Sequence, residues 1–202
     1  MEFILYYQKG TRSQRVRWLL EELGLNYKLE LINLFKGDGF SREHLQRHPL
    51  GQLPVLMING RPMFESGAIV HWLADRYPEK GFSPALNTDL RCDFNQWMYF
   101  SVTSLEMPAW EIILHSKIIP KKDAVKEIIP FANKNLLQVF DVLEKEVSNK
   151  RYMLGDKFSA VDIMVGYILM WFPEYLSDFP QLQKYTGHLK QRPAYIRSID
   201  GN

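Results

Sequence analysis

Glu65 and Ser66 place a carboxylate beside a hydroxyl where the sequence pattern changes from strand to helix. Two short apolar runs, 55–58 and 61–64, precede them and are joined by Asn59-Gly60, a dipeptide that favours a tight hairpin turn. A helical run follows them, and its start offers free backbone N–H groups and a positive partial charge. The pattern therefore predicts a site for a small anionic ligand. The alternative is an ordinary hairpin in which Ser66 only caps the helix.

The elements before this hairpin alternate between strand and helix. Phe3–Tyr7 is apolar and aromatic, as a buried strand would be. The next run has its apolar residues at helical spacing, and Gly24 is suited to end that helix; these residues are Val16, Leu19, Leu20 and Leu23. Tyr27–Leu34 alternates as a second strand, and a short helix is expected over 41–47. With the hairpin and its helix, the order is βαβ followed by ββα.

The second half of the chain shows only helical periodicity after a linker at 79–87. One long helix, or a pair broken near Pro108, is expected over 89–114, and another over 124–147. Ser159 and Asp162 have the spacing of a capping box, in which each side chain accepts a hydrogen bond from the backbone N–H of the other residue. We therefore expect an α/β domain at 1–78 and an all-α domain at 88–202.

Composition and charge exclude several classes of protein. The 202 residues are 46% hydrophobic and 24% charged, which is typical of a globular chain. The net charge of +2 is too small to indicate binding to nucleic acid or to a membrane. No apolar run approaches the roughly 20 residues that span a bilayer. Cys92 is the only cysteine, and the N-terminus lacks a signal-peptide pattern, so we expect a cytoplasmic protein without an internal disulfide.

Three stretches together resemble the soluble glutathione S-transferase family: residues 6–16 with their helix, the hairpin from Gln52-Leu53-Pro54 to Glu65-Ser66, and the Ser159-x-x-Asp162 box. The resemblance covers nearly the whole chain and is nearest to the serine-type pattern of the theta and delta classes. It implies a thioredoxin-like βαβ-ββα domain that binds glutathione, followed by an all-helical domain. It also implies glutathione as co-substrate, no metal, and a homodimer.

The family activates the glutathione thiol with a hydroxyl donor. Three residues are candidates for it here, and the remaining alternative is that no side chain donates. Alignment of Tyr6-Tyr7-Gln-Lys-Gly10-Thr11 with the serine-type pattern places Thr11 on the donor. The alternative alignment places Tyr6 on the donor of the tyrosine-type members. Ser13 is the third candidate, although as an expected helix cap its oxygen would already bond to the backbone. At least one of the two tyrosines is expected to pack in the strand instead.

The resemblance also assigns the contacts that hold glutathione. Glu65 and Ser66 would hold the γ-glutamyl amino and carboxylate groups. The main chain of Leu53 would bind the peptide part of the ligand, which requires a cis bond to Pro54. Gln52 would reach a carboxylate or an amide of the ligand.

The acceptor pocket falls on the first long helix of the second half, at Met107, Trp110, Glu111 and Leu114. For Met107 and Leu114 the alternative is a stripe in the core of the helical domain.

Three functions stay open. The first is conjugation of glutathione to small hydrophobic electrophiles. The second is another glutathione-dependent reaction, as in a disulfide reductase, a peroxidase or a dehalogenase. The third is a non-enzymatic regulatory protein with the same fold.

Overall fold

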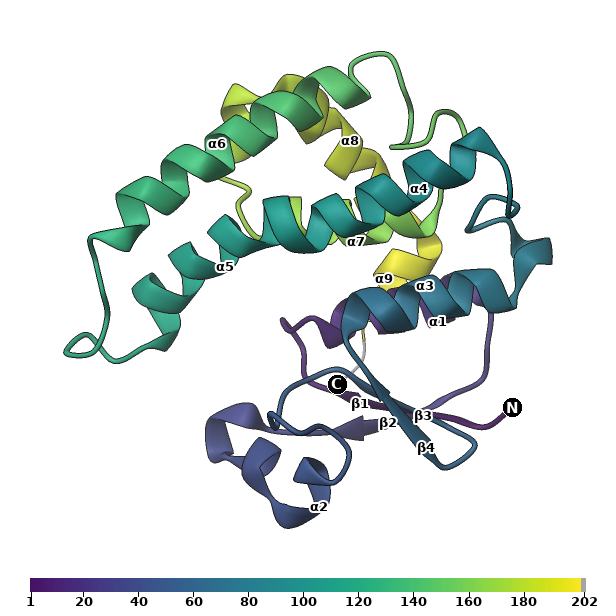
Figure 1. Cartoon of the computed structure of the whole chain (residues 1–202), viewed down its shortest axis with the longest axis vertical. Helices are drawn as coiled ribbons and strands as arrows, with labels where there is room; N and C mark the ends of the chain where they lie inside the picture. Colours follow the sequence, from purple (N-terminus) through teal and green to yellow (C-terminus); the bar gives the residue numbers. More distant parts are fainter. Residues whose placement is uncertain (201–202) are drawn as a thin grey trace. The chain divides into compact units, whose positions relative to one another are not determined.

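The structure, a computed structural model, describes residues 1–200 and contains two compact units (Figure 1). The first unit is residues 1–83 together with the segment from Lys190 onward, and the second is residues 84–189. The helical domain was expected to extend over 88–202, but the second unit ends at residue 189. The difference arises because the last helix packs within the first unit.

The first unit is built on a four-stranded mixed sheet of order β2-β1-β3-β4. The strands are β1 (Phe3–Tyr7), β2 (Lys28–Leu31), β3 (Val55–Ile58) and β4 (Arg61–Phe64). The pair β1–β2 is parallel, and the other two pairs are antiparallel. Strand β2 is shorter than expected because the chain turns into two 3-10 segments, η1 (Leu34–Lys36) and η2 (Asp38–Phe40).

Helices α1 (Ser13–Leu23) and α3 (Ser66–Arg76) cover one face of the sheet (Figure 1). Alternation along β1 sends Phe3, Leu5 and Tyr7 to the buried face and leaves Ile4 and Tyr6 half-buried on the other. The short helix α2 (Arg42–Leu45) lies on the side of Tyr6. The apolar positions predicted for α1 are all buried, and Gly24 ends it in the left-handed conformation, with φ of 68°.

The last helix, α9 (Pro193–Ile199), packs on α1. Arg192 forms a two-pronged ion pair with Glu22, at 2.5 and 2.8 Å. The Trp18 and Tyr195 rings meet edge to face with centroids 4.8 Å apart. Apolar periodicity predicts a helix here but does not show which unit a terminal helix packs on.

The second unit contains α4 (Asp89–Phe100), α5 (Glu106–Ile113), α6 (Ile128–Val147), α7 (Ala160–Leu169) and nearly all of α8 (Pro180–Lys190). The short segments are η3 (Pro78–Lys80), in the first unit, and η6 (Tyr175–Asp178). The run expected over 89–114 is interrupted by a π turn, η4 (Ser101–Leu105), and continues into a second, η5 (Leu114–Ile118). The first π-helical segment directly precedes α5, and α5 contains Pro108, which has no N–H to donate to a helical hydrogen bond. The change in the helical hydrogen-bond pattern therefore lies before the proline and not at it.

Helix α7 begins with the predicted capping box. Both reciprocal bonds are present, and the Ser159 N–H donates to Asp162 Oδ2 at 2.8 Å. All ten residues of the helix are buried, so the box fixes the start of the central helix of this unit. No helix within residues 1–200 is both long enough and apolar enough to cross a bilayer.

Candidate functional site

The predicted site residues of the first unit lie in chain segments that emerge from one end of the sheet. Tyr6, the last residue but one of β1, pairs with Val55 at the start of β3, and Val55 pairs with Phe64 at the end of β4. The chain segments that follow β1, precede β3 and follow β4 therefore emerge at the same end of the sheet. They are residues 8–13, residues 52–54 and residues 65–66.

Two helix N-termini lie at this end of the sheet. Helices α1 and α3 both begin here with the positive ends of their dipoles, and neither has an acidic residue in its first turn, although the N-cap of α3 is Glu65. Arg15, which is 0% exposed, donates from Nη1 to Ser66 Oγ at 3.1 Å and so links the two helices. Ser66 is the first residue of α3 and Glu65 is its N-cap, so the hydroxyl of Ser66 bonds to Arg15 and does not act as the cap.

Thr11 and Ser13 form one hydroxyl pair. Their oxygens are 2.6 Å apart, and both hydroxyls lie within donating distance of the Gln8 carbonyl, at 2.8 Å from Thr11 and 3.1 Å from Ser13. Ser13 is 0% exposed and its oxygen accepts from the Gln8 N–H at 3.2 Å. The expected use of the Ser13 oxygen by the backbone is therefore present, although Ser13 is the first helical residue and not the cap. Thr11 is half-buried and is the more accessible of the two.

The two tyrosines of β1 have different surroundings. Tyr7 faces the core, its O–H donates to Gln14 Oε1 at 2.5 Å, and burial raises the pKa of its phenol. Tyr6 lies on the opposite face, with the Arg47 guanidinium 4.4 Å from its ring centre and the His44 ring edge-on at 6.1 Å. The strand-packing role expected for at least one tyrosine belongs to Tyr7.

The segment before β3 has the expected backbone form. The Leu53–Pro54 peptide bond is cis, and both residues are buried. Within residues 1–200 the Leu53 N–H and C=O have no hydrogen-bond partner in the protein. The Gln52 side chain is exposed, and the Gln52 carbonyl lies 3.0 Å from His44 Nε2.

Glu65 has an exposed side chain and a backbone φ of 69°, in the left-handed region that non-glycine residues seldom adopt. His48 packs against Phe64 with ring centres 4.9 Å apart, and its Nδ1 accepts from the Leu50 N–H at 3.2 Å. Burial lowers the pKa of His48, and the nearby Glu65 charge opposes that shift. His48 is therefore a packed residue beside the site.

The predicted acceptor residues lie on the second unit, three on α5 and Leu114 at the start of η5. Met107 is 62% exposed, which removes the core alternative for this residue. Trp110, Glu111 and Leu114 are half-buried.

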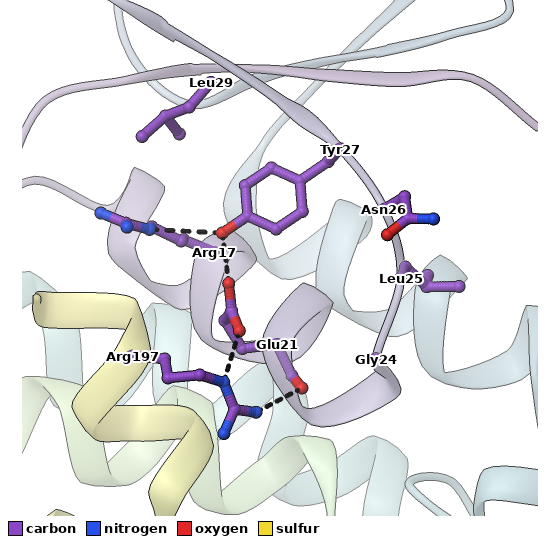
Figure 2. Close-up of a pocket in the computed structure, with 8 residues that line it drawn as sticks. All are labelled: Arg17, Glu21, Gly24, Leu25, Asn26, Tyr27, Leu29 and Arg197. Atoms are coloured by element: carbon purple, nitrogen blue, oxygen red, sulfur yellow. Dashed lines mark hydrogen bonds and ion pairs between the residues drawn. The ribbon is translucent and has the colours of Figure 1, made fainter. Parts of the chain in front are cut away.

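A separate cavity of about 520 Å³ lies at the far end of α1 (Figure 2). Its polar side chains already bond to one another: the Tyr27 O–H donates to Glu21 at 2.6 Å and accepts from Arg17 Nε at 3.3 Å, and Arg197 Nε donates to Glu21 at 2.8 Å. Desolvation and the Glu21 carboxylate raise the pKa of Tyr27 to about 12, so the phenol stays neutral. The cavity lies beside the joint between α1 and α9, away from the candidate site.

Two residues of the site, Arg15 and His44, have roles that the motifs alone do not show. Arg15 lies on the same face of the helix as the buried Leu19 and Leu23. A charged residue at such an apolar position indicates a buried charge that needs a polar partner or a ligand. His44 lies in a four-residue helix, which is too short for periodicity to show its burial. Within residues 1–200, no cluster of three or more His, Cys, Asp or Glu side chains could hold a metal ion.

Comparison with known proteins gives matches to both halves of the chain. Residues 1–75 match the family model "Glutathione S-transferase, N-terminal domain", and residues 105–193 match "Glutathione S-transferase, C-terminal domain". Glutathione S-transferase F10 of Arabidopsis thaliana is 28% identical over 166 residues, which cover 81% of this chain and 77% of that protein.

Solved structures resemble the chain along nearly its whole length. The glutathione transferase URE2P8 of Phanerochaete chrysosporium, crystallised with oxidized glutathione, has a TM-score of 0.88 and 25% identity over 97% of this chain and 92% of its own. A glutathione transferase of Methylococcus capsulatus strain Bath has a TM-score of 0.86 and 26% identity over 98% and 97% of the two chains.

Proposed function

Given that this chain belongs to the glutathione S-transferase family, we propose that it conjugates the glutathione thiolate to small hydrophobic electrophiles. The observation that carries the proposal is the convergence at one end of the sheet of a hydroxyl pair, the N–H and C=O of Leu53, which are unpartnered within residues 1–200, and a Glu-Ser pair. The positive ends of two helices and a buried arginine lie beneath them. A tripeptide with a thiol, an amine and two carboxylates matches this set group by group.

In this proposal each group of the site has one role. Glu65 binds the ligand's amino group, and Ser66 binds the γ-glutamyl carboxylate. The free N–H and C=O of Leu53 pair with the cysteinyl part of the ligand as an added strand would. Gln52, whose side chain is exposed, reaches a carboxylate or an amide.

Activation of the thiol needs a hydrogen-bond donor to the thiolate. A free thiol has a pKa of about 8.5, so only a few per cent is thiolate at pH 7. We assign the donor to Thr11, because it is the accessible member of the hydroxyl pair. Ser13 can donate to Thr11 Oγ1 and leave the Thr11 proton for the thiolate. Tyr6 is the remaining candidate. The thiolate sulfur then bonds to the electrophilic carbon, and an aryl halide would lose halide with its electron pair.

The donor can be identified from the titration of bound glutathione. Thr11→Ala is expected to raise the thiol pKa by one to two units, equivalent to about 1–3 kcal/mol for a lost hydrogen bond to a charge. Thr11→Ser should keep most of the thiolate, and Tyr6→Phe should leave the pKa unchanged. The measurement is thiolate absorbance against pH. A raised pKa in Tyr6→Phe with an unchanged one in Thr11→Ala would assign the donor to Tyr6.

A calorimetric titration with glutathione, followed by two activity assays, distinguishes conjugation from the other glutathione-dependent reactions. Turnover of an aryl halide supports the transferase, and turnover of a mixed disulfide with no aryl halide activity supports a reductase. Absence of glutathione binding supports a non-enzymatic role. The exposed Met107 offers an apolar contact for an electrophile on the second unit.

We further propose that the protein is a cytoplasmic homodimer, as usual for this family. Light scattering at micromolar concentration is expected to give about twice the 23.8 kDa of the chain. A mass equal to that of a single chain would contradict the dimer.

A further inference from the structure

The His44 imidazole is completely buried beside the candidate site. It is 0% exposed, it lies edge-on to the Tyr6 ring at 6.1 Å, and its Nε2 is 3.0 Å from the Gln52 carbonyl oxygen. A carbonyl oxygen only accepts hydrogen bonds, so Nε2 must carry the hydrogen. The imidazole is therefore the donor in this bond.

The other ring nitrogen, Nδ1, makes no hydrogen bond within the described part of the chain that would offset the cost of its burial. Nδ1 is buried and has no hydrogen-bond partner within residues 1–200. An unpartnered buried polar atom costs free energy, and a phenyl ring would fill the same space without that cost. The polar ring is thus explained by its bond to Gln52 and not by packing alone.

The Gln52 carbonyl belongs to the same peptide unit as the Leu53 N–H. A peptide unit is planar, and in the trans form its C=O and N–H point in opposite directions. Only the next bond, between Leu53 and Pro54, is cis. A hydrogen bond that fixes the Gln52 oxygen toward His44 therefore fixes the Leu53 N–H away from it. That N–H has no partner in the described protein and is free for a ligand.

We propose that His44 is a positioning residue for glutathione: its Nε2–H holds the Gln52 carbonyl and so aims the Leu53 N–H at the cysteinyl part of the ligand. This inference rests on the proposed function, since it concerns the same ligand. It assigns to α2 a role in affinity for glutathione and no role in the chemical step, because the hydrogen bond of the His44 imidazole is made to the Gln52 carbonyl, on the segment that holds the peptide part of the ligand.

A matched pair of variants tests the role of Nε2. A glutamine amide nitrogen reaches about as far as Nε2, whereas an asparagine amide nitrogen reaches only as far as Nδ1. His44→Gln should therefore bind glutathione within a few-fold of wild type, and His44→Asn should bind roughly tenfold or more weakly, the loss expected for one hydrogen bond. Calorimetry gives the two dissociation constants, and amide NMR of the free variants should show a changed Leu53 resonance in His44→Asn only.

His44→Phe removes the donor and keeps a ring against Tyr6. We expect a raised KM for glutathione with kcat at saturation and the bound thiol pKa unchanged, a pattern that a general loss of structure would not give. Ser41→Ala is the control, because it removes the cap that the His44 backbone N–H donates to at 3.2 Å and leaves the imidazole in place. It should leave glutathione affinity within about twofold of wild type.

The outcomes distinguish this inference from the function on which it rests. If wild type does not bind glutathione in calorimetry, the proposed function fails. If wild type binds and the folded His44→Asn and His44→Phe variants bind equally well, the positioning role alone is overturned. Equal weakening by Ser41→Ala and His44→Asn would also overturn it, since α2 as a whole would then matter and not the imidazole.

Discussion

Replacing Asp162 by alanine is expected to lower the free energy of unfolding by roughly 3–5 kcal/mol, the range for removing a fully buried, hydrogen-bonded carboxylate. Asp162 is 0% exposed and accepts from the N–H groups of Met153 and Ser159, both at 2.8 Å, and from the Tyr185 O–H at 2.8 Å. Alanine leaves these donors buried without an acceptor. Thermal unfolding should show a melting temperature lower by roughly 10 °C for a chain of this size.

Asp156→Ala is the control, since Asp156 is an exposed aspartate in the segment that precedes α7. It should change the melting temperature by no more than about 2 °C, as expected for a surface position. Equal melting temperatures for Asp162→Ala and wild type would show that the box does not hold the start of α7.

The same carboxylate should make unfolding depend on pH in a definite direction. Burial raises the pKa of Asp162 from 3.8 to about 6, so the folded state holds the proton more tightly than the unfolded state does. A group of this kind stabilises the fold fully below the unfolded pKa, and the contribution is lost as pH rises through the folded pKa. Between about pH 4 and pH 6, wild type should therefore lose stability relative to Asp162→Asn, which has no titrating group there. Parallel pH profiles would contradict the raised pKa.

Substitution of Ser66 or Glu65 by alanine is expected to raise the KM for glutathione roughly tenfold or more, while kcat falls less. Each side chain is proposed to hold the γ-glutamyl end, which is far from the sulfur and is bound alike in the ground and transition states. One charge-assisted hydrogen bond is worth about 1.5–3 kcal/mol. Steady-state kinetics against glutathione at a fixed electrophile concentration gives both constants.

Two variants serve as controls for that result. Ser66→Thr keeps the hydroxyl that accepts from Arg15 and should stay closer to wild type than Ser66→Ala. Glu79→Ala removes an exposed carboxylate of η3 in the same unit and should leave the KM unchanged. A KM that stays the same in both Glu65→Ala and Ser66→Ala would remove the proposed γ-glutamyl site.

The sheet and its order of elements follow from local sequence rules. Phe3–Tyr7 and the hairpin around Asn59-Gly60 are where apolar alternation and turn chemistry place them, and Asn59 has the positive φ, 49°, that the turn needs. Strand β2 was expected to be longer, because alternation was followed to Leu34. The strand ends at Leu31, and one further hydrogen bond joins this chain segment to β1, from the Ile32 N–H to the Tyr7 carbonyl at 3.0 Å. A strand ends where its pairing with a neighbouring strand ends, and the alternation of apolar and polar residues does not show that position.

The site was predictable where a motif carries it and not where tertiary contacts do. Glu65, Ser66 and the cis bond before Pro54 follow from the family pattern, although their ligand contacts stay proposals. The hydroxyl pair of Thr11 and Ser13 depends on how the loop after β1 closes on the Gln8 carbonyl. The burial of His44 depends on a helix of four residues packing against Tyr6. Neither arrangement has a periodicity that a sequence could display.

The attachment of α9 to α1 makes the first unit discontinuous along the chain, with the whole of residues 84–189 inserted between its two parts. During synthesis on the ribosome, the sheet and α1 emerge long before the residues that cover Trp18 and pair with Glu22. Loop closure over more than a hundred residues is then required before the first unit is complete, which favours slow docking of the last helix. A fragment cut after Ser83 would keep every strand of the sheet and still expose the surface that α9 covers. Cotranslational aggregation, and not loss of the glutathione residues themselves, is the hazard that this arrangement creates for the isolated first part.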